Sequence, residues 1–120
     1  MSRALVLVHG IFSSGKTWDS LKKTIADDEQ LTSLLVTTFE YSSPRFRFTP
    51  TRVIPDYDDI ALKLWTFLQS KLSDYEKIAI IAHSQGGLIV QRMLAHQVEA
   101  GSAQLLARIQ QIICKYSEVL

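Results

Sequence analysis

The sequence predicts a three-layer α/β/α fold with a mainly parallel sheet, in a single domain that spans residues 1–120. Short continuous apolar runs alternate along the chain with segments whose apolar residues recur at helical spacing. Such runs are typical of parallel strands that helices cover on both faces. With 120 residues, 47% of them hydrophobic, the chain has the size and composition of one domain with a buried core.

The first half of the chain contains two expected strands and one expected helix. Ala4–Val8 is apolar at every position and predicts a buried strand. A helix is expected from about residue 17 to residue 28, where apolar side chains share one stripe. Leu34–Tyr41 is rich in β-branched and aromatic residues, which predicts a second strand.

The second half repeats this alternation after a long loop. Ser42–Pro55 holds all 3 prolines and is expected to be exposed. Asp56–Leu72 has apolar residues at helical spacing and acidic residues in its first turn, which predicts a helix. Lys77–Ala82 predicts a third buried strand, Gly86–Gln97 a third helix and Ile109–Cys114 a fourth strand. Because parallel sheets bind ligands where their strands end, the loops after the strands are the expected site.

The charge and cysteine content exclude several classes of protein. There are 13 Lys and Arg against 12 Asp and Glu, a formal net charge of +1, which argues against nucleic-acid binding. The single cysteine, Cys114, excludes an intrachain disulfide. No apolar run reaches the ~18 residues of a membrane helix, and the short run after Met1 lacks the length of a signal peptide. The sequence therefore predicts a cytoplasmic protein without a transmembrane segment.

A serine follows the third expected strand in a pattern associated with nucleophilic catalysis. Residues 82–86 read Ala82-His83-Ser84-Gln85-Gly86. A nucleophile elbow holds its serine in a strained turn above the sheet, so the residues two before and two after it must be small. Ser84 is therefore the candidate nucleophile, and the Gln85 N–H at the helix start is a candidate oxyanion donor. The alternative is that the serine only caps a helix beside a glycine-rich turn.

The loop after the first strand admits two interpretations. Gly10–Thr17 matches the phosphate-loop pattern G-x-x-x-x-G-K-[ST], whose lysine and threonine would bind terminal phosphates and magnesium. Alternatively, residues 9–13 form the oxyanion loop of a serine hydrolase, in which Gly10 lets the chain approach the serine and the Ile11 N–H is the second donor. We favour the hydrolase interpretation because it explains both loops, and because the third strand does not end in the acidic residue that a magnesium site needs.

Two side chains near these loops are candidate substrate contacts, namely Phe12 in the first loop and His83 beside the serine. The side chain of His83 is expected to point away from Ser84 across the turn. We therefore expect it to pack and to hydrogen-bond rather than to act as the catalytic base.

The two loops together resemble the N-terminal half of an α/β-hydrolase, and particularly the lipase and esterase-like group that includes the GPI inositol-deacylase-like serine esterases. The matching segments are VLVHGIFSSGKTW and IAIIAHSQGGLIVQRML, and with the strand and helix between them they span about Leu5 to Ala95. The resemblance implies that Ser84 is the nucleophile and that the Ile11 and Gln85 amides form the oxyanion hole. It also implies hydrolysis of a small-molecule or lipid carboxylic ester through an acyl-enzyme, with no metal and no organic cofactor.

The region after Ser84 departs from the pattern of this family. In the fold the catalytic residues run Ser, then Asp or Glu, then His, whereas here His96 precedes both remaining acids, Glu99 and Glu118. His96 also lies about 18 Å from Ser84 along the expected helix, at ~1.5 Å per residue, and is expected to be a surface histidine. The sequence thus predicts an incomplete α/β-hydrolase domain with impaired activity and an exposed sheet edge open to association.

A non-catalytic function is the alternative. The long loop alternates basic and aromatic groups at Arg45, Phe46, Arg47, Phe48 and Arg52. These side chains would suit a binding module that meets an acidic lipid or protein surface. The other interpretation is a solvated loop whose phenylalanines pack on the domain.

Overall fold

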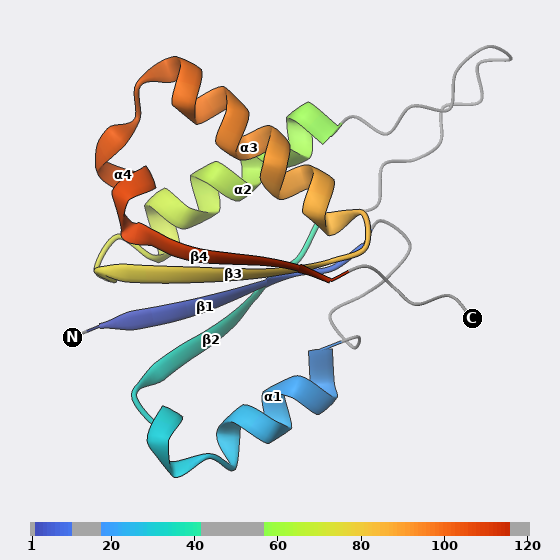
Figure 1. Cartoon of the computed structure of the whole chain (residues 1–120), viewed down its shortest axis with the longest axis vertical. Coiled ribbons are helices and arrows are strands. Elements are labelled where there is room, and N and C mark those ends of the chain that lie inside the picture. The colour runs from blue at the N-terminus through green and yellow to red at the C-terminus, as the bar shows by residue number, and fades with distance from the viewer. Residues whose placement is uncertain (1, 11–17, 42–56, 116–120) are drawn as a thin grey trace, which may run out of the picture.

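A computed structural model describes residues 2–10, 18–41 and 57–115 of the chain. Strands and helices alternate through these residues (Figure 1). The strands are β1 (Arg3–Val8), β2 (Leu34–Phe39), β3 (Lys77–His83) and β4 (Ile109–Lys115). The helices are α1 (Asp19–Ala26), the short 3-10 helix η2 (Glu29–Leu31), α2 (Tyr57–Lys71), α3 (Gly86–Ala100) and α4 (Ala103–Arg108).

The four strands form one sheet in the order β2-β1-β3-β4. All three neighbouring pairs are parallel, so the strands end at the same edge of the sheet (Figure 1). The chain crosses from β1 to β2 and then passes to the other side of β1 to form β3. The strand order therefore reverses between β1 and β3. Parallel sheets of this kind bind ligands at the carboxyl ends of the two strands that flank such a reversal.

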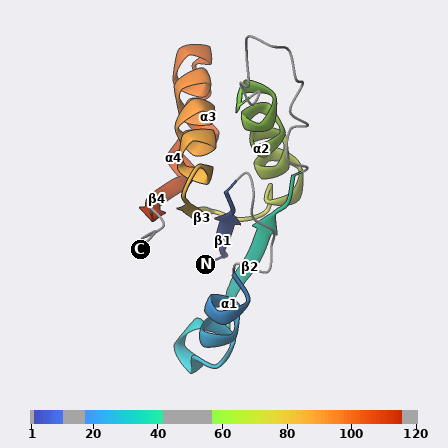
Figure 2. The same ribbon diagram turned by 90° about the vertical axis from the view of Figure 1, so that its right-hand side faces the viewer.

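Helices cover both faces of the sheet, which gives three layers (Figure 2). Helices α2 and α3 lie together on one face, and α1 lies on the other. Right-handed crossovers produce this arrangement, because the two directions of chain travel place successive helices on opposite faces. The predicted α/β class with a parallel sheet is confirmed.

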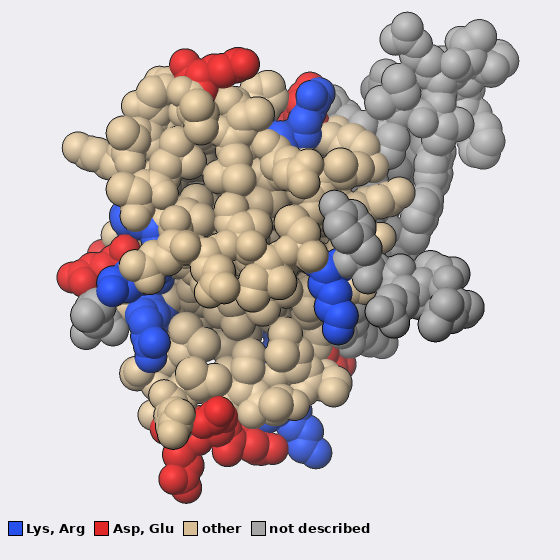
Figure 3. Space-filling view, in the orientation of Figure 1, with Lys and Arg blue, Asp and Glu red and all other residues tan. Residues whose placement is uncertain are grey.

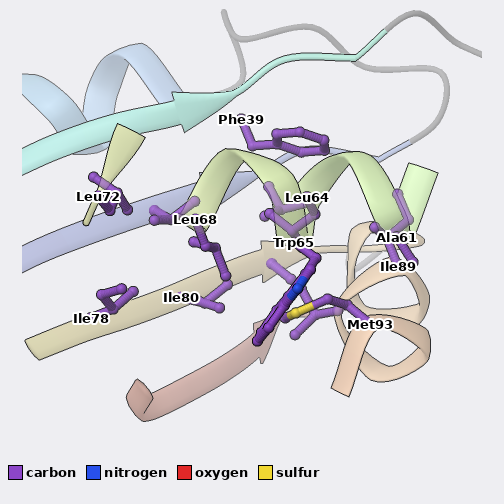
Figure 4. Close-up of a cluster of buried hydrophobic side chains, with 14 of the residues drawn as sticks. Phe39, Ala61, Leu64, Trp65, Leu68, Leu72, Ile78, Ile80, Ile89 and Met93 are labelled. Carbon is purple, nitrogen blue, oxygen red and sulfur yellow. The ribbon is translucent and has the colours of Figure 1, made fainter. Parts of the chain in front are cut away.

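The larger hydrophobic core lies between the sheet and the layer formed by α2 and α3 (Figure 4). Its buried side chains come from β1, β2, β3, α2, α3 and α4 and include Phe39, Leu64, Leu68, Ile80, Ile89 and Met93. A smaller core on the opposite face is built on Leu5, Leu7 and Trp18. Because β1 lies between two strands and two helix layers, its residues from Ala4 to Val8 are all buried, which explains the continuous apolar run in the sequence.

Each expected strand and helix in the described part of the chain is present, with differences at the ends. Helix α3 continues past Gln97 to Ala100 and stops at Gly101, whose φ of 73° lies in the left-handed region that favours glycine. The expected loop Ser42–Pro55, with its arginines and phenylalanines, lies outside the described residues.

Two short elements, η2 and α4, have no counterpart among the expected elements. Each is too short for helical spacing to be visible in the sequence. Helix α4 places Arg108 so that its guanidinium donates hydrogen bonds to the backbone carbonyls of Leu72 and Tyr75, just after α2. This contact joins the segment after α3 to the end of α2.

The surface bears on three further expectations. Within the described ranges, strand β4 pairs only with β3 and therefore forms one edge of the sheet, where Ile113 is 45% exposed. Association with another molecule through this edge stays a prediction. On the face shown in Figure 3, Lys and Arg are interspersed with Asp and Glu over the described residues. None of the helices described has the length and apolar character needed to cross a membrane, and the cytoplasmic location stays a prediction.

Candidate active site

The turn between β3 and α3 holds Ser84 in an unusual backbone conformation. Its φ is 56°, and in the described part of the chain it is the one non-glycine residue with a positive φ. A residue with a side chain is disfavoured there by ~1 kcal/mol or more, so the surroundings must hold it in place. Two hydrogen bonds do so: the Ser84 N–H donates to the Lys115 carbonyl at 2.7 Å, and the Ser84 carbonyl accepts from the Gly87 N–H at 3.0 Å.

The small residues on either side of Ser84 have the steric role that the sequence predicts. Ala82 is fully buried in β3, where it lies in register with Val8 on one side and Cys114 on the other. A Cβ atom at Gly86 would lie 2.6 Å from the Val8 carbonyl oxygen and 2.8 Å from that of His9. Real Cβ atoms do not approach backbone oxygens so closely, so only glycine fits. The start of α3 therefore lies directly against the end of β1.

The Gln85 amide lies at the start of α3. Gln85 is the residue before the helix, with φ of −65° and ψ of −15°. The first backbone hydrogen bonds at the start of α3 are donated by residues after Gln85. The Gly87 N–H donates to the Ser84 carbonyl, and the Leu88 N–H donates to the Gln85 carbonyl. The first amides of a helix point outward along its axis and carry the positive end of the helix dipole. The position suits a donor to a developing oxyanion, and that role of Gln85 stays a prediction.

The turn after β1 begins with His9, a buried residue that is 2% exposed. Its Nδ1 donates to the Gly10 carbonyl at 2.7 Å, and its ring stacks on Tyr41 with 4.3 Å between ring centroids and an angle of 5°. The Tyr41 hydroxyl donates to the His9 carbonyl at 2.7 Å. Burial, and then the nearby phenol of Tyr57, raise the pKa of Tyr41, so its hydroxyl remains a donor at neutral pH.

Tyr41 is absent from the candidate residues of the sequence, although one signal could have found it. The β1–β2 register pairs Val8 with Phe39. Continuing both chains by two residues brings Tyr41 beside Gly10 and next to His9. The sequence signal is a tyrosine at the end of the expected strand Leu34–Tyr41, and its pairing with the His-Gly turn follows once the β1–β2 register is known.

His83 lies at the end of β3 and packs against α1's side of the sheet. Its ring meets the edge of Trp18 at 6.0 Å between centroids and 86° between planes. Among the residues that the structure describes, the buried Nδ1 of His83 and Nε1 of Trp18 have no hydrogen-bond partner. The contact agrees with the packing expected for His83, whereas the described residues offer no hydrogen-bond partner to its Nδ1. The role of His83 as a substrate contact stays a prediction.

His96 lies on α3, where it takes part in a polar cluster with α2. Its Nε2 lies 3.0 Å from Oδ1 of Asp58, and the Nε of Arg92 lies 2.9 Å from the same oxygen. The hydrogen bond from His96, together with the charge of Arg92, lowers the pKa of Asp58. Both His96 and Asp58 are about half exposed, with side chains 51% accessible. The chain thus contains an acid–histidine pair, but on the outer surface of the two helices.

The remaining candidates lie outside the described residues. They are Ile11 and Phe12, together with the other residues of 11–17 that the phosphate-loop interpretation needs. Their roles stay predictions. In the ranges that the structure covers, no three His, Cys, Asp or Glu side chains are grouped so that they could hold a metal ion.

Comparison with known proteins gives one match. The sequence profile of the family described as "Putative serine esterase (DUF676)" matches residues 2–116, which is nearly the whole chain. Searches of curated proteins and of solved structures returned no match. The matched range includes both turns at the carboxyl ends of β1 and β3.

Proposed function

Because the chain belongs to the DUF676 serine esterase family, we propose that it is a carboxylic ester hydrolase of the α/β-hydrolase type with Ser84 as its nucleophile. The observation that carries this proposal is the φ of 56° at Ser84, in a two-residue turn between β3 and α3. Strain at a serine in such a turn is the feature of a nucleophile elbow. The position of the turn at the reversal of strand order supports the same assignment.

The reaction would proceed in two steps. The Ser84 oxygen attacks the acyl carbon while its proton passes to water, and the alcohol leaves with a proton from water to give an acyl-enzyme. Water then attacks the acyl-enzyme and releases the carboxylic acid and the free serine. In each step the Gln85 and Ile11 amides would donate hydrogen bonds to the oxygen that becomes negative. The substrate would be a small-molecule or lipid ester, and these steps require no cofactor.

We propose that none of the three histidines is the general base. The Nδ1 of His9 donates to a backbone carbonyl and its ring is stacked and buried. The ring of His83 meets Trp18, and His96 pairs with Asp58 about 18 Å along α3 from Ser84, far beyond the ~3 Å of a proton transfer. Without a histidine base, we expect slow acylation that depends on the oxyanion donors and on substrate binding.

The experiment is covalent labelling with a fluorophosphonate probe, followed by mapping of the modified residue. We expect labelling at Ser84, none in Ser84→Ala, and normal labelling in Ser70→Ala, whose hydroxyl bonds within α2. Turnover of a chromogenic ester should be several orders of magnitude below that of an esterase with its base in place. Labelling that persists in folded Ser84→Ala, or a folded wild-type protein that is never labelled, would refute the proposal.

A further inference from the structure

Three parts of the chain meet at the carbonyl oxygen of His9. The Tyr41 hydroxyl donates to this oxygen at 2.7 Å. Gly86, the first residue of α3, comes so close that a Cβ atom there would lie 2.8 Å from the same oxygen. The end of β1, the residue after β2 and the start of α3 therefore share one contact point. Of these three parts, Gly86 lies two residues after Ser84 in the sequence.

The contacts of Tyr41 fix both the backbone and the side chain of His9. The hydroxyl holds the carbonyl, while the phenol ring stacks on the imidazole at 4.3 Å. The imidazole in turn donates to the Gly10 carbonyl at 2.7 Å. Because His9 is 2% exposed, water has little access to replace these bonds, and a lost donor would leave its carbonyl unpaired.

We propose that Tyr41 is a positioning residue that sets the distance between the His9–Gly10 turn and the start of α3. This inference rests on the proposed function, since Gly86 directly follows Ser84 and Gln85, so a shift of the His9 carbonyl against Gly86 would shift the proposed nucleophile turn. The turn that holds Ser84 and Gln85 and the turn that begins with His9 belong to different strands, so their spacing depends on such a contact. A displacement of about 1 Å at such a group lowers the rate of a reaction by up to ~100-fold.

The raised pKa of Tyr41 agrees with this role. A phenol that lost its proton at moderate pH would face the His9 carbonyl with a negative charge and would repel it. Burial favours the neutral phenol, so the donor persists through the neutral and mildly alkaline range.

The first test compares Tyr41→Phe with wild type in the kinetics of Ser84 labelling. Phenylalanine retains the ring that stacks on His9 and removes only the hydroxyl. We expect the labelling rate constant at saturating probe to fall about tenfold, the factor that one hydrogen bond to a buried acceptor is worth, and the half-saturating concentration to stay the same. Tyr75→Phe is the matched control, a half-buried tyrosine packed on the same core just before β3, and should change neither value.

The second test needs no reactive serine. Hydrogen exchange of the peptide that contains His9 and Gly10 should be about tenfold faster in Tyr41→Phe and unchanged in Tyr75→Phe, also in a Ser84→Ala background. A purely structural effect would lower the fraction of protein that is labelled without changing the rate constant of the folded part. If Ser84 is labelled at the same rate in Tyr41→Phe, or if exchange is unchanged, the role of Tyr41 is refuted. If wild type is not labelled at all, the proposed function fails instead.

Discussion

Two turns lie side by side at the carboxyl ends of β1 and β3, and they are held in different ways. The turn after β3 has two residues, Ser84 and Gln85, and its strain is balanced by bonds to residues that follow it in the chain. The turn after β1 begins with His9 and Gly10, and is held by Tyr41, which lies 32 residues beyond His9.

The difference separates a turn determined by sterics from one determined by a distant hydrogen bond. In the β3 turn, the limits on Ala82 and Gly86 follow from how close a short connection must come to the neighbouring strand. In the β1 turn, the stabilising group is Tyr41, which follows a different strand, β2. We therefore expect substitutions in the β3 turn to affect folding most, and substitutions around the β1 turn to affect its geometry.

The largest effect on stability is expected for Gly86→Ala, which would disrupt the close contact between the start of α3 and the end of β1. The new methyl group would meet the Val8 and His9 carbonyl oxygens at 2.6 and 2.8 Å, and backbone atoms cannot move aside as a flexible side chain can. We expect the free energy of unfolding to fall by about 3 kcal/mol, at the upper end of overpacking costs. Chemical denaturation followed by circular dichroism measures this value.

The neighbouring Gly87→Ala is the matched control. Its methyl group would meet only the Cys114 side chain, with Sγ at 3.4 Å, so we expect a change within about 1 kcal/mol. Gly101→Ala tests the cost of backbone conformation alone, because that glycine has a φ of 73° and open space around the position of a Cβ atom. We expect this substitution to lower the free energy of unfolding by about 1 kcal/mol. Equal stabilities of Gly86→Ala and Gly87→Ala would show that α3 is not pressed against β1.

The same contrast explains how much of the molecule could be predicted from its sequence. The strands and the three longer helices could be predicted from the periodicity of apolar residues, and the β3 turn from the five consecutive residues 82–86. Each of these depends on local geometry. Tyr41 could not be found in that way, since its role depends on the register between β1 and β2. Helix α4 was invisible for a related reason: it is short, and Arg108 stabilises it through carbonyls just after α2.

A smaller effect on stability is expected when the backbone strain at Ser84 is relieved by substitution. Ser84→Ala and Ser84→Gly both remove the hydroxyl, but only glycine adopts a φ of 56° without steric cost. We therefore expect Ser84→Gly to be about 1 kcal/mol more stable than Ser84→Ala, after the greater chain entropy of unfolded glycine is included. Denaturation midpoints of the two variants, neither of which is labelled by the probe, give the difference directly.

This comparison of variants sharpens the contrast between the turns. A more stable Ser84→Gly would mean that the fold maintains an unfavourable backbone at a position where glycine would suit it better. Such a cost is expected at a functional residue rather than in an ordinary connection. Equal stabilities would indicate that the turn carries no strain, and the argument for an elbow would lose its main support.

The smallest effect is expected at the polar cluster of Asp58, Arg92 and His96, which lies away from both turns. The pKa of Asp58 is lowered in the folded chain, so the folded state binds its proton less tightly than the unfolded state. The stabilisation is therefore present above the unfolded pKa of about 3.9 and is lost as the pH falls through the folded pKa. We expect wild type to lose slightly more stability on acidification than Asp58→Asn, with Asp74→Asn as an exposed control that behaves like wild type.

The same cluster provides a direct check on the absence of a base among the histidines. An acid hydrogen-bonded to a histidine is the pairing that a serine hydrolase uses, but here it spans the outer faces of α2 and α3. If its geometry excludes it from the reaction, His96→Gln and Asp58→Asn should each label at Ser84 at the wild-type rate over the whole pH range tested. A tenfold or greater loss of labelling in His96→Gln, with Tyr75→Phe unaffected, would instead mean that His96 reaches Ser84, which requires the part of α3 between the two residues to unfold.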